Sequence, residues 1–231
     1  MREADLQTLR ELQLFKKMSQ RQLARLTQPA SLQRYPQNTH LITEGDRPDF
    51  LHVLLDGCVE LFATHNGRQT TIDILRPTTT FILAAVILDQ PYLKSARTLL
   101  ESRVLLLPAD AVRGVFREDP HFAYATIAEL ALRYRSVTKL LKDQKLRSTP
   151  ERLANWLLKS ATAEGGAGSV TLDFEKKTLA SLLGTTPENL SRALAQLESV
   201  GVKTSGKIIT IADLDELRGY AKPSPLIDDG I

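Results

Sequence analysis

The spacing of apolar residues changes between residues 26 and 32, and the patterns before and after this point predict different elements. From Leu6 to Leu26 the apolar positions recur at helical spacing, and Ser19 is suited to cap the second of two short helices. From Leu32 to Leu107 they form short runs of Val, Ile, Leu, Phe and Thr separated by turn residues. Asn66-Gly67 is a strong hairpin signal, because a type I′ turn needs positive φ at both central positions. Many short strands at near-regular intervals predict a β-sandwich or roll.

After Pro120 the pattern becomes helical for about 27 residues, which corresponds to about 40 Å. The apolar positions alternate in steps of four and three, the spacing of a coiled-coil seam. A helix that lies on its own domain would also carry an apolar stripe. A helix this long extends beyond one small domain, however, so we expect it to pair with a second copy. The predicted seam consists of Ala123, Ile127, Leu130, Tyr134, Val137, Leu141 and Gln144.

A new segment begins at Ser148-Thr149-Pro150-Glu151, because the residue before a proline is displaced from the helical region. We predict a helix over 151–163, a loop over 164–168, a strand over 169–172, two more helices and a wing of two strands around 204–207. The two helices have the spacing of a helix-turn-helix. Ala180 allows them to cross closely, and Gly184 can adopt the positive φ of the turn. The segment therefore predicts a winged helix-turn-helix.

The second of these helices carries the candidate DNA-reading residues. Thr186 can cap it, and Pro187 suits its first turn. Glu188, Ser191 and Arg192 share one face. A Glu accepts from the cytosine amino group and an Arg donates to guanine O6 and N7, so this face can read a G·C pair. The alternative is an ordinary amphipathic helix with a surface Glu-Arg pair. Further predicted DNA contacts are Thr186, Asn189, Lys203 and Lys207, with Lys176 and Lys177 before the first helix as candidates for phosphates.

Composition narrows the class of protein. The net charge of +3 and a pI of about 9.0 are only mildly basic, so nucleic-acid binding would need a local patch. The single cysteine, Cys58, excludes a disulfide framework or an iron-sulfur cluster built from this chain's cysteines and suits a reducing cytoplasm. No apolar run approaches the roughly 20 residues that span a bilayer, and we expect no membrane association. The tail over 223–231 is expected to be mobile.

The order of roll, long helix and winged helix-turn-helix resembles the cyclic-AMP receptor and fumarate-nitrate regulator superfamily of bacterial transcription factors. The resemblance covers residues 10–220, and in the roll it is supported by Glu44-Gly45-Asp46 and by residues 55–61. It implies an α+β fold with a β-roll, or double-stranded β-helix, like a cyclic-nucleotide-binding domain. The implied divisions are a sensor domain over 1–119, a dimerisation helix over 120–147, a DNA-binding domain over 148–222 and the tail.

The resemblance also implies a DNA site and a mode of action. The pattern Glu188-x-x-Ser191-Arg192 is similar to that of the fumarate-nitrate regulator branch, which implies TTGAT-type half-sites in an inverted repeat. A homodimer would bind such promoter DNA and activate transcription by recruiting RNA polymerase.

The effector is a separate question. Cyclic-nucleotide binders of this superfamily hold ribose and phosphate with a Gly-Glu-Leu segment and an Arg-Ser pair. Here Leu83-Ala84-Ala85 and Lys94-Ser95 stand in their places, so the carboxylate is missing and a point charge replaces a bidentate arginine. We therefore expect no cyclic-nucleotide binding. The cysteine cluster of the oxygen-sensing branch is also missing.

Residues 81–88 and 95–99 resemble the NnrR-type branch, nitric-oxide-responsive activators of denitrification genes whose sensing is thought to involve haem. An apolar lining would suit such a ligand, and the alternative is a filled core without a ligand. The predicted effector pocket consists of Phe81, Leu83, Ala84, Ala85, Lys94 and Ser95.

Haem would need an axial ligand, for which His40, His52, His65 and His121 are the candidates. His52 is preferred, because it lies in a strand that is apolar on both faces, although a structural histidine is the alternative. Cys58 is expected to be a buried thiol. We find no nucleophile motif, metal-ligand spacing or phosphate-binding glycine loop, so an enzyme is not expected. The rival functions are a small-molecule-binding regulatory subunit of a partner enzyme and a regulator of the same superfamily with another effector.

Overall fold

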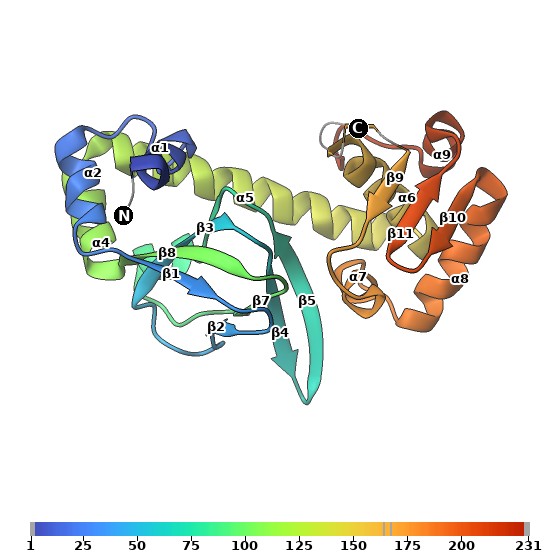
Figure 1. Cartoon of the computed structure of the whole chain (residues 1–231), viewed down its shortest axis with the longest axis horizontal. Helices are drawn as coiled ribbons and strands as arrows, with labels where there is room; N and C mark the ends of the chain where they lie inside the picture. The colour runs from blue at the N-terminus through green and yellow to red at the C-terminus, as the bar shows by residue number, and fades with distance from the viewer. Residues whose placement is uncertain (1–2, 164, 167, 229–231) are drawn as a thin grey trace. The chain divides into compact units, whose positions relative to one another are not determined.

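The computed structural model describes residues 3–163, 165–166 and 168–228. The chain forms two compact units, Met1–Tyr134 and Arg135–Ile231. Helix α5 (Pro120–Leu146) contributes to both units, so the division falls within this helix rather than at one of its ends (Figure 1). Among the described helices, none combines the length and the apolar character needed to cross a membrane.

Two four-stranded antiparallel sheets form the roll of the N-terminal unit, as the sequence predicts. One sheet has the order β1-β8-β3-β6 and the other β2-β7-β4-β5. Asn66 and Gly67 have φ values of 50° and 73°, as predicted for the hairpin between β4 and β5. The strands are β1 (Ser31–Tyr35), β2 (His40–Ile42), β3 (Phe50–Asp56), β4 (Val59–His65), β5 (Arg68–Leu75), β6 (Thr79–Phe81), β7 (Ser95–Thr98) and β8 (Ser102–Pro108).

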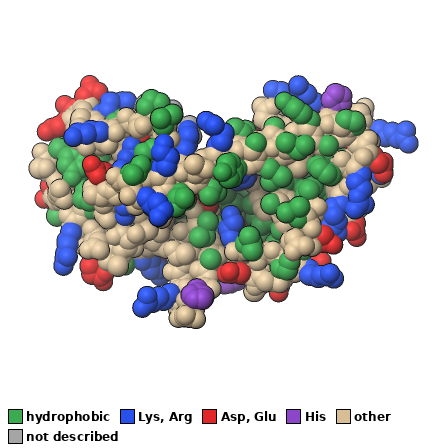
Figure 2. All heavy atoms as spheres, turned by 180° about the vertical axis from the view of Figure 1, so that it is seen from behind, with side chains coloured by type: hydrophobic (Ala, Val, Ile, Leu, Met, Phe, Trp, Pro, Cys, Tyr) green, Lys and Arg blue, Asp and Glu red, His purple; other side chains and the backbone are tan. Residues whose placement is uncertain are grey.

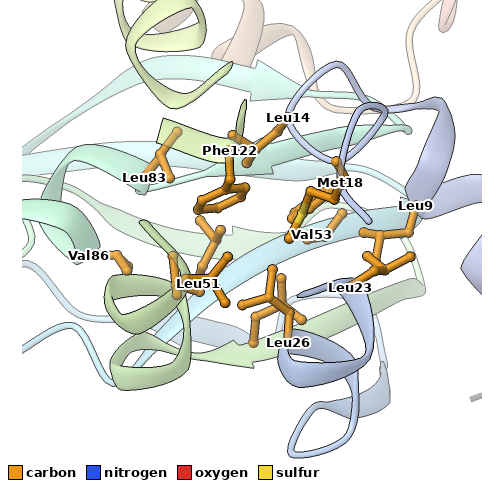
Figure 3. Packing of buried hydrophobic residues seen from close by; sticks show 14 of the residues in the cluster. Leu9, Leu14, Met18, Leu23, Leu26, Leu51, Val53, Leu83, Val86 and Phe122 are labelled. Atoms are coloured by element: carbon orange, nitrogen blue, oxygen red, sulfur yellow. The ribbon is translucent and has the colours of Figure 1, made fainter. Parts of the chain in front are cut away.

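Two hydrophobic clusters hold this unit together. The roll core draws residues from both sheets, among them Leu54, Leu61 and Phe81. The helical core packs helices onto the other face of β3 and β8, with Leu51 and Val53 of β3 and Phe122 of α5 pointing into it (Figure 3). Its helices are α1 (Glu3–Glu11), α2 (Gln20–Thr27), α3 (Leu83–Leu88), α4 (Ala109–Glu118) and the start of α5. Ser19 caps α2 as predicted, accepting from the Gln22 N–H at 3.2 Å.

Helix α3 corrects the prediction that the region from Leu32 to Leu107 consists of strands. It begins after Ile82 and ends before Asp89, both of which have positive φ (61° and 52°). Leu83 and Val86, three residues apart, are its buried residues. A short unbroken apolar run fits a buried strand or a buried helix equally well, so the sequence pattern could not separate the two.

A buried carboxylate on β4 pairs with a half-buried arginine on β7 of the roll. Glu60 is 1% exposed and accepts from Arg97 Nε at 2.7 Å and from Thr71 Oγ1 at 2.6 Å. The Arg97 guanidinium also lies 4.8 Å from the centre of the Phe62 ring. The carboxylate is thus compensated by charge and hydrogen bonds, which a buried ion requires.

The C-terminal unit has the predicted winged helix-turn-helix fold, with a three-stranded sheet in the order β10-β11-β9. Helix α6 begins at Thr149 rather than at Glu151, because Ser148 donates its N–H and its hydroxyl to the Glu151 carboxylate at 2.8 and 2.7 Å, in the manner of a capping box. The elements are α6 (Thr149–Ala163), β9 (Ser169–Thr171), α7 (Lys176–Leu182), α8 (Pro187–Leu197), the short η1 (Glu198–Val200), β10 (Val202–Ser205), β11 (Ile208–Ile211) and α9 (Leu214–Ala221).

The segment after α9 corrects the prediction of a mobile tail over 223–231. Asp228 accepts two hydrogen bonds from the Arg147 guanidinium, and Lys142 Nζ donates to the Leu226 carbonyl at 3.1 Å. The sequence pattern missed this anchoring because the partner residues lie far back along the chain. Residues 229–231 of the predicted tail lie outside the described residues.

Candidate DNA-binding surface

The turn between α7 and α8 has the geometry that its residues predict. Ala180 is fully buried where the two helices meet. Gly184 has φ +63°, and its N–H donates to Ser181 O at 2.9 Å while Thr185 N–H donates to Ala180 O at 2.9 Å. These two bonds form a Schellman motif, which ends α7 and redirects the chain into α8.

Helix α8 is capped and oriented by its own first residues. The Thr186 hydroxyl accepts from Asn189 N–H at 3.3 Å, and Pro187 occupies the first turn. Leu190, Ala193 and Leu197 are buried against the rest of the unit. The opposite face of the helix is therefore turned to solvent.

The predicted reading face is exposed. Glu188, Ser191 and Arg192 all lie on the solvent side of α8. The Ser191 hydroxyl donates to Pro187 O at 3.0 Å. The pKa of Glu188 is lowered, because its carboxylate accepts from its own backbone N–H and from the Thr186 hydroxyl. A carboxylate held in its charged form is the acceptor that a cytosine amino group requires. Contact with bases by these residues stays a prediction.

The lysines predicted to contact phosphates differ in their surroundings. Lys203 and Lys207 are exposed on the β10–β11 hairpin, and Lys207 O accepts from Leu172 N–H at 2.9 Å, which ties the hairpin to the end of β9. Lys176 and Lys177 lie in the first turn of α7 rather than before it. Lys177 pairs with Glu175 at 2.7 Å, so part of its charge is compensated locally.

Arg152 stabilises the turn between α7 and α8 through a hydrogen bond to Leu183 O, and the sequence analysis did not predict this role. It is 9% exposed, and its Nε donates to Leu183 O at 2.9 Å while Nη1 donates to Arg147 O at 2.6 Å. The guanidinium thus joins the end of α7 to the link between α5 and α6. The sequence did contain a signal, because Arg152 is a charged residue close to the apolar positions of the predicted helix. A charge at such a position is expected to have a hydrogen-bonding partner.

Gln144 also lies beside the turn. A Cβ atom on Gly184 would approach the Gln144 Nε2 to 3.0 Å. The last position of the predicted seam is therefore in contact with the helix-turn-helix, a role that the spacing pattern could not reveal.

Most of the predicted dimer contacts are exposed on α5. Ile127, Tyr134, Val137 and Leu141 are exposed by 61%, 75%, 63% and 53%, whereas Ala123 and Leu130 are half-buried. Leu130 packs against the helical core of its own unit. Figure 2 shows that hydrophobic side chains gather in groups on one face of the molecule. Large exposed apolar groups of this kind mark interaction surfaces.

The predicted effector residues are divided between the two hydrophobic clusters, with Phe81 and Ala85 at the roll core and Leu83 in the helical core. Phe81 and Leu83 are separated because the chain turns into α3 between them. Ala84 is exposed, whereas Ala85 and Lys94 are half-buried. Ser95 is buried, and its hydroxyl accepts from Glu44 N–H at 2.9 Å. Burial lowers the pKa of Lys94, with Asp73 opposing the shift and Arg133 adding to it.

His52 does not fit a haem in the conformation described. Its ring is 5% exposed and lies 5.0 Å, centre to centre, from the ring of Phe81, so a porphyrin has no room between them. Its Nδ1 is bonded to Phe50 O at 3.1 Å. His40, His65 and His121 are exposed. Among the described residues, no three His, Cys, Asp or Glu side chains form a metal-binding group. Cys58 is buried, as predicted.

A segment of each unit matches a known family model. Residues 32–119 match the model of the cyclic nucleotide-binding domain, and residues 151–220 match the Crp-like helix-turn-helix domain. A CRP-like cAMP-activated global transcriptional regulator of Mycobacterium tuberculosis is 29% identical over 206 residues, which are 87% of this chain and 92% of that protein. The Cyclic AMP receptor protein of Thermus thermophilus is 29% identical over 173 residues, 74% of this chain and 79% of that protein.

Solved structures show the same fold. A structure described as a putative cAMP-binding regulatory protein from Silicibacter pomeroyi is 26% identical, with a TM-score of 0.65 over 96% of this chain and 100% of that chain. FixK2 from Bradyrhizobium japonicum, at 22% identity, has a TM-score of 0.73 over 82% of this chain and 96% of that chain.

Proposed function

We propose that this chain, which belongs to the CRP/FNR family of DNA-binding transcriptional regulators, binds as a homodimer to an inverted repeat of TTGAT-like half-sites. The observation that carries the proposal is the exposed face of Glu188, Ser191 and Arg192 on a helix-turn-helix whose turn is fixed by hydrogen bonds. A charged face presented by a capped and packed helix is suited to reading base edges in a major groove.

The dimer follows from the exposed side of α5. Ile127, Tyr134, Val137 and Leu141 follow each other in steps of seven, three and four, so they lie on one side of the helix. Pairing with a second copy across a two-fold axis would remove these side chains from water. Such a dimer presents two α8 helices to successive major grooves, about 34 Å apart.

Base reading and anchoring are divided between α8 and the wing. Arg192 donates to guanine O6 and N7, and Glu188 accepts from the paired cytosine, which fixes one G·C pair of each half-site. Lys203 and Lys207 contact phosphates, which adds affinity without sequence information. Activation through RNA polymerase is carried over from the family.

The decisive experiment compares Arg192→Ala with Arg218→Ala, which removes an exposed arginine from α9, away from the reading face. Binding to a TTGAT inverted repeat is measured together with binding to repeats altered at the G·C pair. Arg192→Ala should weaken binding by about 1 to 3 kcal/mol for each half-site and lose discrimination at that pair. Arg218→Ala should retain both. Discrimination that survives Arg192→Ala would remove this residue from the reading face.

For the effector, we propose a ligand other than a cyclic nucleotide, although two of the relatives named above are described by their use of cAMP. Ala84 supplies no carboxylate for a ribose, and the Ser95 hydroxyl is already bonded to Glu44 N–H. Isothermal titration with cyclic AMP should give no saturable heat, and the DNA affinity should stay unchanged. A stoichiometric binding isotherm would overturn this part of the proposal.

A nitric-oxide response in the control of denitrification genes is the remaining part, and it rests on the resemblance to the NnrR-type branch. The packing of His52 against Phe81 argues against haem as the sensor in this conformation. Absorption spectra after addition of haem, with and without nitric oxide, test it. A protein-bound haem spectrum that changes with nitric oxide and is lost in His52→Leu would support haem sensing. A spectrum identical to that of free haem would refute haem as the sensor.

The rival function, a regulatory subunit that controls a partner enzyme, predicts no sequence-selective DNA complex. The match of residues 151–220 to a Crp-like helix-turn-helix favours DNA binding. A gel-shift assay on the inverted repeat against a scrambled duplex separates the two functions, because the rival would show no preference between them.

A further inference from the structure

The C-terminal segment Ser224–Asp228, here called the latch, is bonded to Lys142 near the end of α5 and to Arg147 just after it. Asp228 Oδ1 and Oδ2 accept from Arg147 Nη1 and Nη2 at 2.8 and 2.6 Å, a bidentate pair. The two side chains are 8% and 10% exposed, so the ion pair is almost excluded from water. Removal of either partner of such a pair would leave the other charge buried without compensation, which is strongly unfavourable.

The latch is itself folded around Asp228. Its Oδ2 accepts from Ser224 N–H at 2.7 Å, and its own N–H donates to Ser224 O at 2.7 Å. Lys142 Nζ holds the middle of the segment through Leu226 O. Burial raises the pKa of Asp228, but hydrogen bonds from Arg147 and Ser224 outweigh it and lower the pKa, so the carboxylate stays charged at neutral pH.

Arg147 lies in the link between α5 and α6, the segment 147–148 between Leu146 and Thr149. Its guanidinium bonds backward to Asp143 on α5 at 2.9 Å and to the latch. The Arg147 carbonyl accepts a hydrogen bond from Arg152 on α6. Arg152 also donates to Leu183 O, just before the turn between α7 and α8. The latch therefore belongs to a continuous set of contacts that joins α5, the link and the helix-turn-helix.

We propose that the latch is a positioning element, in which Asp228 and Arg147 fix the angle at which α5 carries the helix-turn-helix and so set the spacing of half-sites that a dimer can bind. The inference rests on the proposed binding of an inverted repeat. A link of two residues outside regular helix can bend at several backbone dihedral angles. A fixed link keeps the second recognition helix near its half-site once the first is bound, which raises its effective concentration.

The test uses the full chain with Asp228→Asn, which removes the charge and keeps the size, and Arg147→Lys, which keeps the charge and loses the bidentate fork. Glu198→Gln is the matched control, because Glu198 is an exposed acidic residue of the same unit. Each protein is titrated with a duplex that carries one TTGAT half-site and with a series of inverted repeats whose spacer changes by one base pair.

The expected result is a loss of about threefold to thirtyfold in affinity for the preferred repeat in Asp228→Asn, with the half-site affinity unchanged. The preference for one spacer length should weaken at the same time, and Arg147→Lys should show the same changes to a smaller extent. Glu198→Gln should match the wild type.

Three other outcomes overturn the proposal in different ways. Equal losses on the half-site and the repeat would show that Asp228 only supports folding of the DNA-binding unit. Wild-type affinity and spacer preference in Asp228→Asn would show that the latch does not position anything. A wild-type protein that binds the repeat no more tightly than the half-site would overturn the proposed dimeric binding and the latch together.

Discussion

The burial of His52 predicts an acid sensitivity of the roll that can be worked out from its surroundings. Burial lowers the pKa of this imidazole from 6.5 to about 4, and the hydrogen bond to Phe50 O only partly offsets the effect. In the unfolded chain the group regains its ordinary pKa. Between these two values the unfolded chain therefore binds a proton that the folded chain does not.

The sign and size of the effect follow. The contribution of neutral His52 to the free energy of unfolding is fully present above about pH 6.5. It is lost as the pH falls toward 4, because the unfolded state is favoured wherever it binds more protons. A difference of about 2.5 pKa units corresponds to about 3 kcal/mol in total, of which about 2 kcal/mol is lost by pH 5. Carboxylates that titrate in the same pH range contribute equally to the pH dependence of the wild type and of a variant that lacks only His52, so the difference between the two proteins isolates the histidine.

The assay compares wild type, His52→Leu and the exposed control His121→Gln. A histidine NMR titration of the full chain gives the pKa directly, and hydrogen exchange of β3 amides gives the local stability. Fluorescence is unsuitable, because the single tryptophan, Trp156, lies in α6 of the other unit. We expect one resonance to be assigned to His52 and to titrate near pH 4. We also expect the pH dependence of β3 protection to be shallower in His52→Leu than in the control.

A His52 resonance that titrates near 6.5 would refute the reasoning, because the ring would then be hydrated rather than packed against Phe81. Identical pH dependence in wild type and His52→Leu would refute it independently, since the acid sensitivity would then arise from other groups.

Three further predictions concern the DNA-binding unit and α5. Val137→Glu should give monomers in light scattering, because it places two like charges on the seam, whereas Leu132→Glu, exposed elsewhere on α5, should not. Lys207→Ala should weaken binding to all sequences alike and, because a dimer loses two phosphate contacts, reduce the slope of log affinity against log salt by about 1.8. Gly184→Ala should lower the free energy of unfolding by about 1 to 2 kcal/mol in denaturant titrations followed by fluorescence, because its φ is +63° and Gln144 stands in the way of a Cβ.

The parts of the fold that depend on neighbouring residues could be predicted from the sequence. Asn66-Gly67 specifies its hairpin, and Gly184, Thr186 and Pro187 specify the turn and the start of α8, because each acts through its own backbone conformation or through a bond a few residues away. The exposed reading face follows from helical spacing alone.

The parts that depend on distant residues could not be predicted. Arg147 and Asp228 are separated by 81 positions, and Arg152 and Leu183 by 31. No periodicity links such pairs, so the latch was expected to be a mobile tail. The effector residues were grouped because they are near in sequence, but the start of α3 sends Phe81 and Leu83 into different cores.

The buried contact between Glu60 and Arg97 constrains how this protein can diverge. Loss of Arg97 alone would leave the Glu60 carboxylate, whose side chain is 1% exposed, without its cation inside the roll, at a cost of about 3 to 5 kcal/mol out of the roughly 5 to 15 kcal/mol that stabilise a typical domain. Two apolar replacements made together avoid that penalty. In orthologues the two positions should therefore covary, because a protein that has changed only one of them is less stable than one that has changed both.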